Sequence, residues 1–378
     1  MHKLVALVLP AGAVLVDELR RTWDDGDAVL PVDARLAGPA RDRLLAAMAP
    51  AVVVDATGRH SVDGARPVES GDALVMATSG TTGVAKGVVL THDAVAASAI
   101  ATSAALAVEP STDRWLCCLP VAHVGGMSVV TRALVTGVPI TVHDGFDAAS
   151  VSRAATDEDC TLVSLVATAL ARIDPGRFRA IVLGGSRPPA VVPPNAVVTY
   201  GMTETGSGVI YDGCALDGVE IRLAGDSEIL LRGPMLLRAY RDGTDPKDGA
   251  GWLATGDIGS WTADGRLAVH GRRDDLIITG GENVWPDPVE TILAGVPGVG
   301  EVAVAGVADP EWGQRVVAFV VPAAGHAPPS LAMLRDAIKA ALAPFAAPRQ
   351  LVLVARLPRT TLGKVQRSAL PTLAETET

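Results

Sequence analysis

The chain has 378 residues, which is more than one ordinary hydrophobic core accommodates, so we expect two domains. Hydrophobic residues make up 49% of the chain and charged residues 20%, enough apolar material for large cores. The net charge of -10 and the aromatic content of only 3% argue against a nucleic-acid partner, which needs positive charge and stacking side chains.

The N-terminal part alternates buried strands with Ala-rich helices. The apolar run Leu4–Val16 is too short to span a bilayer, and Pro10 and Gly12 interrupt it, so we expect a strand followed by a helix entered near Val16 instead of a signal peptide or a membrane insertion. Strands are predicted at 51–55, 73–77, 179–183 and 196–200, and helices at 93–108 and 148–157 with Asp93 and Asp147 as caps. This alternation favours an α/β fold with layered, mostly parallel sheets.

The cysteines indicate a reducing compartment. Cys117, Cys118, Cys160 and Cys214 form neither a Cys-x-x-Cys pair nor a disulfide framework. We therefore expect the protein to be cytoplasmic. No cluster of His, Cys and carboxylates has the spacing of zinc ligands.

Thr78–Gly87, with the sequence TSGTTGVAKG, has the composition of a phosphate-binding loop between two apolar runs. Glycines let successive backbone N–H groups point at an anion, and the Ser and Thr hydroxyls add further donors. The segment is not a Walker loop, because Lys86 is followed by Gly87 instead of Ser or Thr. An ordinary surface turn is the alternative.

After Ala215 the pattern changes to short alternating strands. The segments 218–223, 227–232 and 265–270 alternate polar and apolar residues between Gly and Asp turns, which predicts a small antiparallel β subdomain. Beyond a boundary near Arg273, strands are expected at 302–307, 315–321 and 351–354 and helices at 288–293 and 330–342. We therefore predict a large N-terminal domain at 1–272 and a small α+β domain at 273–378.

Five further segments stand in a fixed order along the chain. They are Leu119–Gly126 (LPVAHVGG), Tyr200–Gly206 (YGMTETG), Trp252–Gly259 (WLATGDIG), Gly271–Asn283 (GRRDDLIITGGEN) and Leu357–Arg367 (LPRTTLGKVQR). Together with the phosphate loop they resemble the acyl- and aryl-CoA synthetases of the adenylate-forming superfamily, from about Asp72 to Arg367. This resemblance implies an AMP-forming ligase that uses ATP, Mg²⁺ and CoA on a small carboxylic acid.

The resemblance assigns the first half-reaction to four residues. Lys364 would bridge the substrate carboxylate and the α-phosphate, a role that suits adenylate formation because developing negative charge must be neutralised with both oxygens held in line. Glu204 would hold Mg²⁺, Thr203 would contact phosphate, and His123 would gate the acyl pocket. Without the resemblance, Thr203 reads equally as a helix cap, and Glu204 as an acid in a first helical turn.

Other residues are assigned to the nucleotide. Asp257 would accept the ribose hydroxyls with Arg272 assisting, although a turn aspartate is the alternative. Gly184, Gly185 and Ser186 resemble the adenine-side loop, and Tyr200 is a candidate stacking surface. The complete set of ATP-binding candidates is Thr78, Ser79, Gly80, Thr81, Thr82, Gly83, Lys86, Gly184, Gly185, Ser186, Tyr200, Gly201, Met202, Thr203, Asp257 and Arg272.

The second half-reaction is assigned to the C-terminal domain. Gly280, Gly281 and Asn283 match the loop that lines the pantetheine tunnel, and Asp274 matches the hinge. The resemblance implies that this domain rotates between the two half-reactions. The glycines also fit a plain turn.

The N-terminal part departs from the typical family pattern, because only 77 residues precede Thr78. This short form resembles the actinobacterial-type o-succinylbenzoate-CoA ligases of menaquinone biosynthesis, although Ala122 stands where a second histidine or an aromatic residue is often found. The alternatives are a ligase for another aryl or short to medium acyl acid, a ligase that loads a carrier-protein pantetheine, a nucleotide-binding regulatory protein and a luciferase-like oxidase. The sequence does not determine the oligomeric state, and a homodimer is one of the alternatives.

Overall fold

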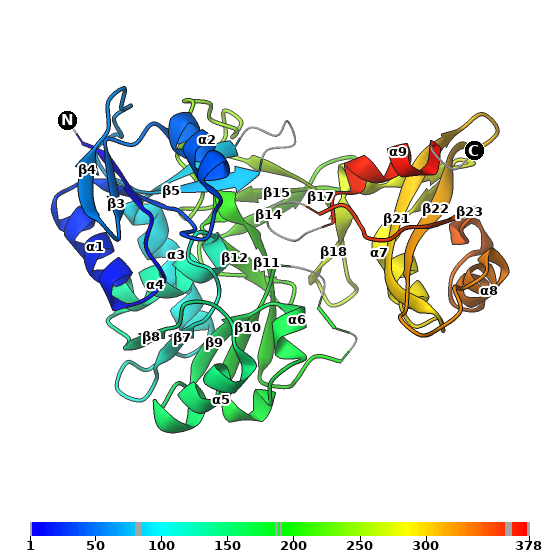
Figure 1. Cartoon of the computed structure of the whole chain (residues 1–378), viewed down its shortest axis with the longest axis horizontal. Coiled ribbons are helices and arrows are strands. Elements are labelled where there is room, and N and C mark those ends of the chain that lie inside the picture. Colours follow the sequence, from blue (N-terminus) through cyan, green and yellow to red (C-terminus); the bar gives the residue numbers. More distant parts are fainter. Residues whose placement is uncertain (1, 80–84, 186–187, 190, 360–364, 376–378) are drawn as a thin grey trace. The chain divides into compact units, whose positions relative to one another are not determined.

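The computed structural model describes residues 2–79, 85–185, 188, 189, 191–359 and 365–375 (Figure 1). The chain divides into two compact units. The first unit comprises Met1–Arg222, Leu230–Ala254 and Ala263–Leu267, and the second comprises Leu223–Ile229, Thr255–Thr262 and Ala268–Thr378. The second unit thus includes two segments before Arg273, and the predicted boundary at 272/273 stays a prediction.

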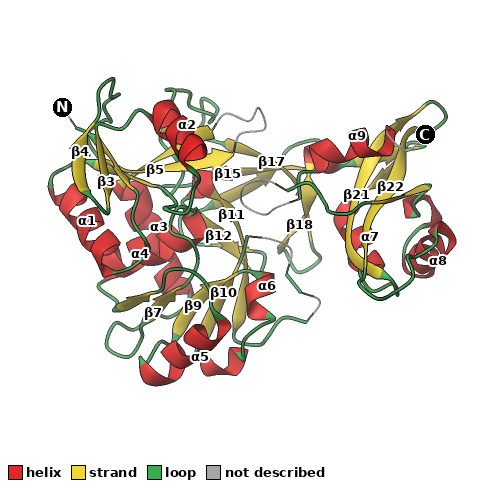
Figure 2. Ribbon diagram, viewed as in Figure 1, coloured by secondary structure: helices red, strands yellow, loops and turns green. Residues whose placement is uncertain are grey.

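The first unit contains a seven-stranded sheet in the order β16-β6-β5-β2-β1-β3-β4. Figure 2 colours the strands yellow and the helices red, and labels β3, β4 and β5 of this sheet. Its strands are β1 (Leu4–Leu7), β2 (Ala28–Pro31), β3 (Val52–Asp55), β4 (Gly58–Ser61), β5 (Asp72–Ser79), β6 (Ala85–Thr91) and β16 (Ala239–Tyr240). The central pairs are parallel, and the outer pairs are antiparallel. Helix α2 (Gly38–Met48) packs on this sheet through Met48, Leu44 and Leu45.

A second seven-stranded sheet follows the order β13-β12-β11-β10-β9-β7-β8. Its strands are β7 (Trp115–Cys117), β8 (Ile140–Val142), β9 (Leu162–Leu165), β10 (Ala180–Leu183), β11 (Ala196–Met202), β12 (Ser207–Tyr211) and β13 (Cys214–Ala215). Strands β8 to β11 run parallel, as their continuous apolar sequences predict, and β12 and β13 complete the sheet in antiparallel pairs. The layered, mostly parallel α/β prediction is confirmed.

The helices of this unit are α1 (Ala13–Asp24), α3 (His92–Ala105), α4 (Val124–Thr136), α5 (Ala148–Asp157) and α6 (Ala167–Leu170). Asp147 caps α5 by accepting a hydrogen bond from the Ser150 N–H at 2.8 Å, as predicted. The predicted cap of α3 is wrong. Thr91 accepts from the Ala94 N–H at 3.1 Å, so Asp93 lies inside the first turn, where its charge complements the helix dipole.

A four-stranded sheet has the order β14-β15-β17-β18, and its strands contribute residues to both units. The strands are β14 (Glu220–Leu223), β15 (Glu228–Arg232), β17 (Leu253–Trp261) and β18 (Leu267–Arg272). Strands β14, β15 and β18 match the three alternating segments predicted after Ala215, whereas β17 was not predicted as a strand. Burial alternates along β15, where Ile229 and Leu231 are buried and their neighbours are half-buried.

The second unit also contains β19 (Ile277–Thr279), β20 (Glu282–Val284), β21 (Val299–Asp309), β22 (Gly313–Pro322) and β23 (Gln350–Leu353) in one sheet. Alternate residues of β21 and β22 face two cores. Val304 and Val316 pack with α7 (Pro286–Leu293) and α8 (Leu331–Ala341), whereas Phe319 packs with α9 (Leu370–Glu375). Among the described residues, no helix is long and apolar enough to cross a membrane.

Candidate active site

The arms of the predicted phosphate loop are a strand pair. Strands β5 and β6 are antiparallel, with Thr78 opposite Lys86 and Ser79 opposite Ala85. The Thr78 hydroxyl donates to the Lys86 carbonyl at 3.3 Å. The tip of the loop, with the candidates Gly80, Thr81, Thr82 and Gly83, lies outside the described residues. The described arms therefore fix where the loop begins and ends.

The Tyr200–Gly206 motif forms the end of β11 and a tight turn. A register shift between Tyr200 and Gly201 interrupts the pairing with β12, which continues to Met202 opposite Ser207, and a single 3₁₀ turn at Thr203–Thr205 follows. The Thr205 hydroxyl is buried and accepts a hydrogen bond from the Met202 N–H at 2.9 Å. This turn fixes the backbone direction at Thr203 and Glu204. The sequence analysis could assign both residues to one motif but not orient them.

Gly201 lies where no side chain fits. A Cβ atom added there would lie 2.2 Å from the Ser207 carbonyl oxygen and 2.7 Å from the Gly208 Cα. Both neighbours are backbone atoms of the paired strand, so neither moves without disturbing the sheet. The glycine thus permits the close approach that the motif needs.

We expect Gly201→Ala to destabilise the fold by about 1–3 kcal/mol, because overpacking forces backbone shifts. Denaturant midpoints of purified protein measure the effect. Gly225→Ala is the matched control, since a Cβ at Gly225 meets nothing within 4 Å. An unchanged midpoint for Gly201→Ala would mean that the strand pair tolerates a side chain at this position.

The Glu204 carboxylate contacts another part of the first unit. The Tyr240 hydroxyl donates to Glu204 Oε1 at 3.0 Å, and the Leu237 N–H donates to the Glu204 carbonyl at 2.7 Å. Lys86 Nζ lies 5.1 Å from the centre of the Tyr240 ring. Two predicted site residues, Lys86 and Glu204, therefore meet through Tyr240, which the sequence analysis did not single out although the chain has only three tyrosines.

The donor set at Glu204 fits a magnesium ion carried by a nucleotide. Within the described part of the chain, no group of three or more His, Cys, Asp or Glu residues could by itself hold a metal ion. Mg²⁺ is usually held by one or two carboxylates together with substrate phosphates and water. One carboxylate beside the phosphate-loop strands suits that arrangement better than an all-protein site.

The predicted adenine-side loop follows β10 directly. Gly185 has φ of +79°, a conformation that favours glycine, and a Cβ at Gly184 would lie 2.7 Å from Thr199 Oγ1. Tyr200 is half-buried in the neighbouring strand β11, and Ser186 lies outside the described residues. The two glycines thus allow the chain to turn closely over β11.

His123 lies at the N-cap position of helix α4, and its side chain accepts no capping hydrogen bond from the first turn. A Cβ at Gly126 would lie 2.4 Å from the Pro120 carbonyl oxygen, so the second glycine of the motif permits this tight entry into the helix. Asp33 lies near His123. Its carboxyl pKa is lowered mainly by the hydrogen bond from Arg35, with a smaller effect of the His123 charge.

Asp257 and Arg272 pair within the second unit. Arg272 Nη1 lies 3.3 Å from Asp257 Oδ1 and donates to the Thr255 carbonyl at 2.8 Å. Asp257 is buried, and its backbone N–H donates to the Thr255 hydroxyl. The two residues assigned to the ribose therefore lie side by side on β17 and β18.

The residues assigned to CoA and the hinge also belong to the second unit. Gly280 and Gly281 have φ of +60° and +83° and join β19 to β20 as a two-residue hairpin turn. Asn283 is exposed on β20, and Asp274 is exposed in a 3₁₀ turn at Arg273–Asp275. The two glycines thus form a turn, as the alternative in the sequence analysis stated, and a turn of this kind can also bind a ligand. Lys364 lies outside the described residues.

A buried cation that the sequence analysis missed lies in α4. Arg132 is 1% exposed, and its guanidinium donates from Nη2 to Ser207 Oγ at 3.2 Å and stacks 4.8 Å from the Trp115 ring. Its Nε and Nη1 have no hydrogen-bond partner in the described structure. Burial lowers the pKa of Arg132. A buried guanidinium without a carboxylate is costly, which indicates a role beyond packing.

Comparisons with known proteins identify the family of the chain. A family model described as AMP-binding enzyme matches residues 27–240, and one described as AMP-binding enzyme C-terminal domain matches residues 288–364. A Mycobacterium tuberculosis (strain ATCC 25618 / H37Rv) protein named probable 2-succinylbenzoate-CoA ligase is 38% identical over 360 residues, 88% of this chain and 93% of that protein. The 2-succinylbenzoate-CoA ligase of Bacillus subtilis (strain 168) is 32% identical over 335 residues, 79% of this chain and 68% of that protein.

Solved structures of an o-succinylbenzoate CoA synthetase are also similar to this chain. The o-succinylbenzoate CoA synthetase from Bacillus subtilis in complex with the acyl-adenylate intermediate OSB-AMP has a TM-score of 0.86 and 28% identity, covering 97% of this chain and 87% of that chain. The same synthetase in complex with ATP and magnesium ion has a TM-score of 0.84 and 27% identity, covering 97% and 89%.

Proposed function

The chain belongs to the AMP-binding enzyme family, and on that premise we propose that it joins 2-succinylbenzoate to CoA through an acyl-adenylate. The observation that carries the proposal is the 38% identity over 88% of the chain to a protein named for this reaction. The geometry at Glu204 and Lys86 supports the nucleotide half of the proposal, since a carboxylate and an ammonium flank one tyrosine beside the phosphate-loop strands.

In this proposal the first unit binds the triphosphate. Thr78 and Lys86 contact phosphates from β5 and β6, Thr203 adds a hydroxyl, and Glu204 would hold Mg²⁺. The ion would neutralise the negative charge that develops on the phosphate oxygens. Gly184 and Gly185 lie beside the adenine, and the Tyr200 ring stacks on it.

The proposal assigns the remaining steps to the second unit and to Lys364. Asp257 and Arg272 hold the ribose, and Lys364 aligns the acid with the α-phosphate. The domain at 273–378 then rotates about Asp274, and the Gly280-Gly281 turn with Asn283 receives the pantetheine. Four reduced cysteines, three of them buried, suit a cytoplasmic enzyme. Light scattering of the purified protein decides between a monomer and a homodimer.

Arg132 supplies the polar partner that a second carboxylate needs. 2-Succinylbenzoate carries two carboxylates, and only one of them is activated. The helix that contains Arg132 begins at the LPVAHVGG motif, which the family uses at its acyl pocket, and the guanidinium retains two unpartnered nitrogens. We therefore include Arg132 as the residue that recognises the second carboxylate.

We expect Arg132→Met to lower kcat/KM for 2-succinylbenzoate about tenfold to a hundredfold, the range for losing a hydrogen bond to a charged group. Benzoate and 4-oxo-4-phenylbutanoate each lack one of the two carboxylates and serve as comparison substrates. The comparison acid that keeps the reacting carboxylate and lacks the second one should lose little further activity in the variant. Equal losses on every acid would contradict a recognition role for Arg132.

An acid panel tests the proposed function as a whole. Purified protein is incubated with ATP, Mg²⁺, CoA and one acid at a time, and the thioester is identified by mass. We expect turnover of 2-succinylbenzoate well above that of benzoate or octanoate. Preference for octanoate would overturn the choice of acid, and a product formed only on a carrier-protein pantetheine would favour the carrier-loading alternative. Absence of pyrophosphate release with every acid would favour the regulatory alternative.

A further inference from the structure

Tyr240 lies on a short strand that is fixed at both ends. Strand β16 pairs with β6, so that Tyr240 lies opposite Val88. On one side the Arg238 N–H donates to the Val89 carbonyl at 2.9 Å, and on the other the Arg241 N–H donates to the Gly87 carbonyl at 2.6 Å. The strand that carries Tyr240 is thus bonded to the strand that carries Lys86.

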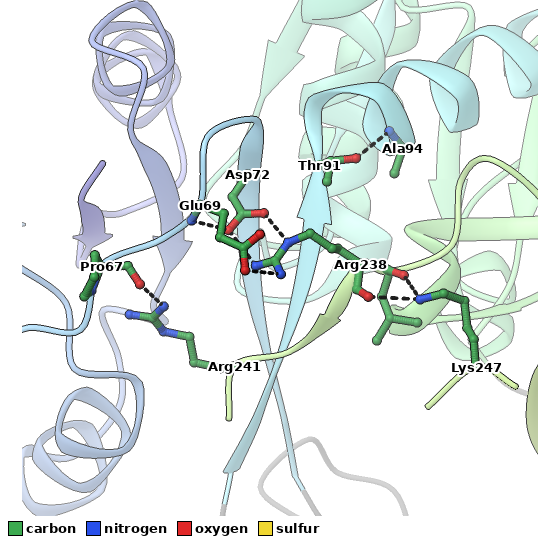
Figure 3. Close-up of polar contacts among 9 residues, drawn as sticks. Pro67, Glu69, Asp72, Thr91, Ala94, Arg238, Arg241 and Lys247 are labelled. Carbon is green, nitrogen blue, oxygen red and sulfur yellow. Dashed lines mark hydrogen bonds and ion pairs between the residues drawn. The ribbon is translucent and has the colours of Figure 1, made fainter. Parts of the chain in front are cut away.

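The two flanking arginines anchor this strand to the rest of the first unit. Arg238 binds Asp72 through Nε and Nη2 at 2.8 and 2.9 Å and Glu69 through Nη1 at 2.6 Å (Figure 3). Asp72 is 2% exposed, so this ion pair is shielded from solvent on the carboxylate side. Such bidentate pairs have little freedom to reorient.

Arg241 is anchored by backbone carbonyl groups. Its guanidinium donates to the Pro67 carbonyl at 2.7 Å (Figure 3). It also donates to the Met48 carbonyl at 3.2 Å and to the Arg66 carbonyl. Burial lowers the pKa of Arg241 to about 10, so the side chain still carries its charge at neutral pH. A Cβ at Gly87 would lie 2.8 Å from the Arg241 Cβ, so this glycine leaves the room that the arginine occupies.

We propose that Tyr240 is a positioning residue that holds the Glu204 carboxylate and the Lys86 ammonium in fixed directions for the nucleotide. The inference rests on the proposed function, in which these two groups serve the metal and the phosphates. The hydroxyl donates to Glu204 Oε1 at 3.0 Å, and in this proposal the second carboxylate oxygen would bind the cation. The ring face attracts Lys86 Nζ at 5.1 Å from its centre, within the range of a cation–π interaction.

This arrangement separates two opposite charges that would otherwise approach each other. A direct Lys86–Glu204 pair would neutralise the groups that the metal and the phosphates need. An aromatic ring with a terminal hydroxyl contacts both groups at once, and the anchored arginines on either side keep that ring in place. Tyr240 therefore acts through Glu204 and Lys86 and need not contact the nucleotide.

Tyr240→Phe tests the inference because it removes the hydroxyl and keeps the ring. The rate of pyrophosphate release is measured with ATP and 2-succinylbenzoate over a range of Mg²⁺ concentrations. We expect the Mg²⁺ concentration at half-maximal rate to rise about tenfold, a typical loss for a hydrogen bond to a charged group. Tyr211→Phe is the matched control, since its buried hydroxyl bonds to Thr102 Oγ1 at 3.1 Å, and it should leave the Mg²⁺ dependence unchanged.

A double-mutant cycle separates positioning from general stabilisation. If Tyr240 acts through the carboxylate, Tyr240→Phe should change little further in a Glu204→Gln background. An undiminished effect in that background, or a lowered melting temperature with unchanged Mg²⁺ dependence, would overturn the inference. Wild-type protein without Mg²⁺-dependent pyrophosphate release would overturn the proposed function, whereas an active wild type matched by Tyr240→Phe would overturn this inference alone.

Discussion

Lys364→Ala is expected to lose acyl-adenylate formation by roughly 10²–10³ in rate, because an in-line positioning charge at the developing negative charge is worth about that much. The variant should still convert a supplied acyl-adenylate and CoA to the thioester, since the lysine serves only the first step. Pyrophosphate release measures the first half-reaction, and thioester mass measures the second. The prediction depends on the LPRTTLGK match, as Lys364 lies outside the described residues.

Asp274→Pro is the counterpart variant. Proline fixes φ and disfavours the helical conformation of the residue before it, here Arg273. Arg273 bonds to Asp226 at 2.7 Å and Glu228 at 2.6 Å, so the local turn is held on its N-terminal side. Adenylation should survive in this variant while thioester formation falls. Equal loss of both half-reactions in both variants would contradict domain alternation.

Glu204→Gln is expected to slow Mg²⁺-dependent adenylation by about 2–4 kcal/mol of transition-state stabilisation, by analogy with the loss of one oxyanion donor. The fold should persist, because the amide still accepts from the Tyr240 hydroxyl and the backbone bond from Leu237 is unaffected. Rates of pyrophosphate release at limiting and saturating Mg²⁺ measure the effect.

Glu220→Gln provides a control for the loss of one negative charge. Glu220 is exposed and pairs with Arg232 at 2.6 Å, and neither residue is among those assigned to the nucleotide. It should leave the Mg²⁺ dependence unchanged. Unchanged turnover of Glu204→Gln at limiting Mg²⁺ would remove Glu204 from the metal site.

Much of the fold could be predicted because its strands are continuous apolar runs. The segments 179–183 and 196–200 predicted β10 and β11, since parallel strands covered on both faces contain few polar residues. Helix boundaries were harder. The sequence analysis named Asp93 as the cap of α3, whereas the Ala94 N–H donates to Thr91, two residues earlier, because helix ends are defined by hydrogen bonds that sequence alone does not show.

The contacts between distant segments could not be predicted in the same way. The motifs named Glu204 and Lys86, but the tyrosine that joins them lies 36 residues beyond Glu204 on a strand of only two residues. The burial of Arg132 could not be predicted either, because this residue of α4 contacts Trp115 on β7 and Ser207 on β12. The local sequence pattern gives no information on contacts between residues far apart in the chain. These contacts form only when the strands assemble into sheets.

One incubation tests the central claim most directly. Purified protein receives ATP, Mg²⁺ and 2-succinylbenzoate, first without and then with CoA, and the products are identified by mass. The proposal predicts pyrophosphate and an enzyme-bound acyl-adenylate without CoA, followed by AMP and 2-succinylbenzoyl-CoA once CoA is added. Formation of ADP and phosphate, or a thioester without any adenylate, would contradict the AMP-forming mechanism.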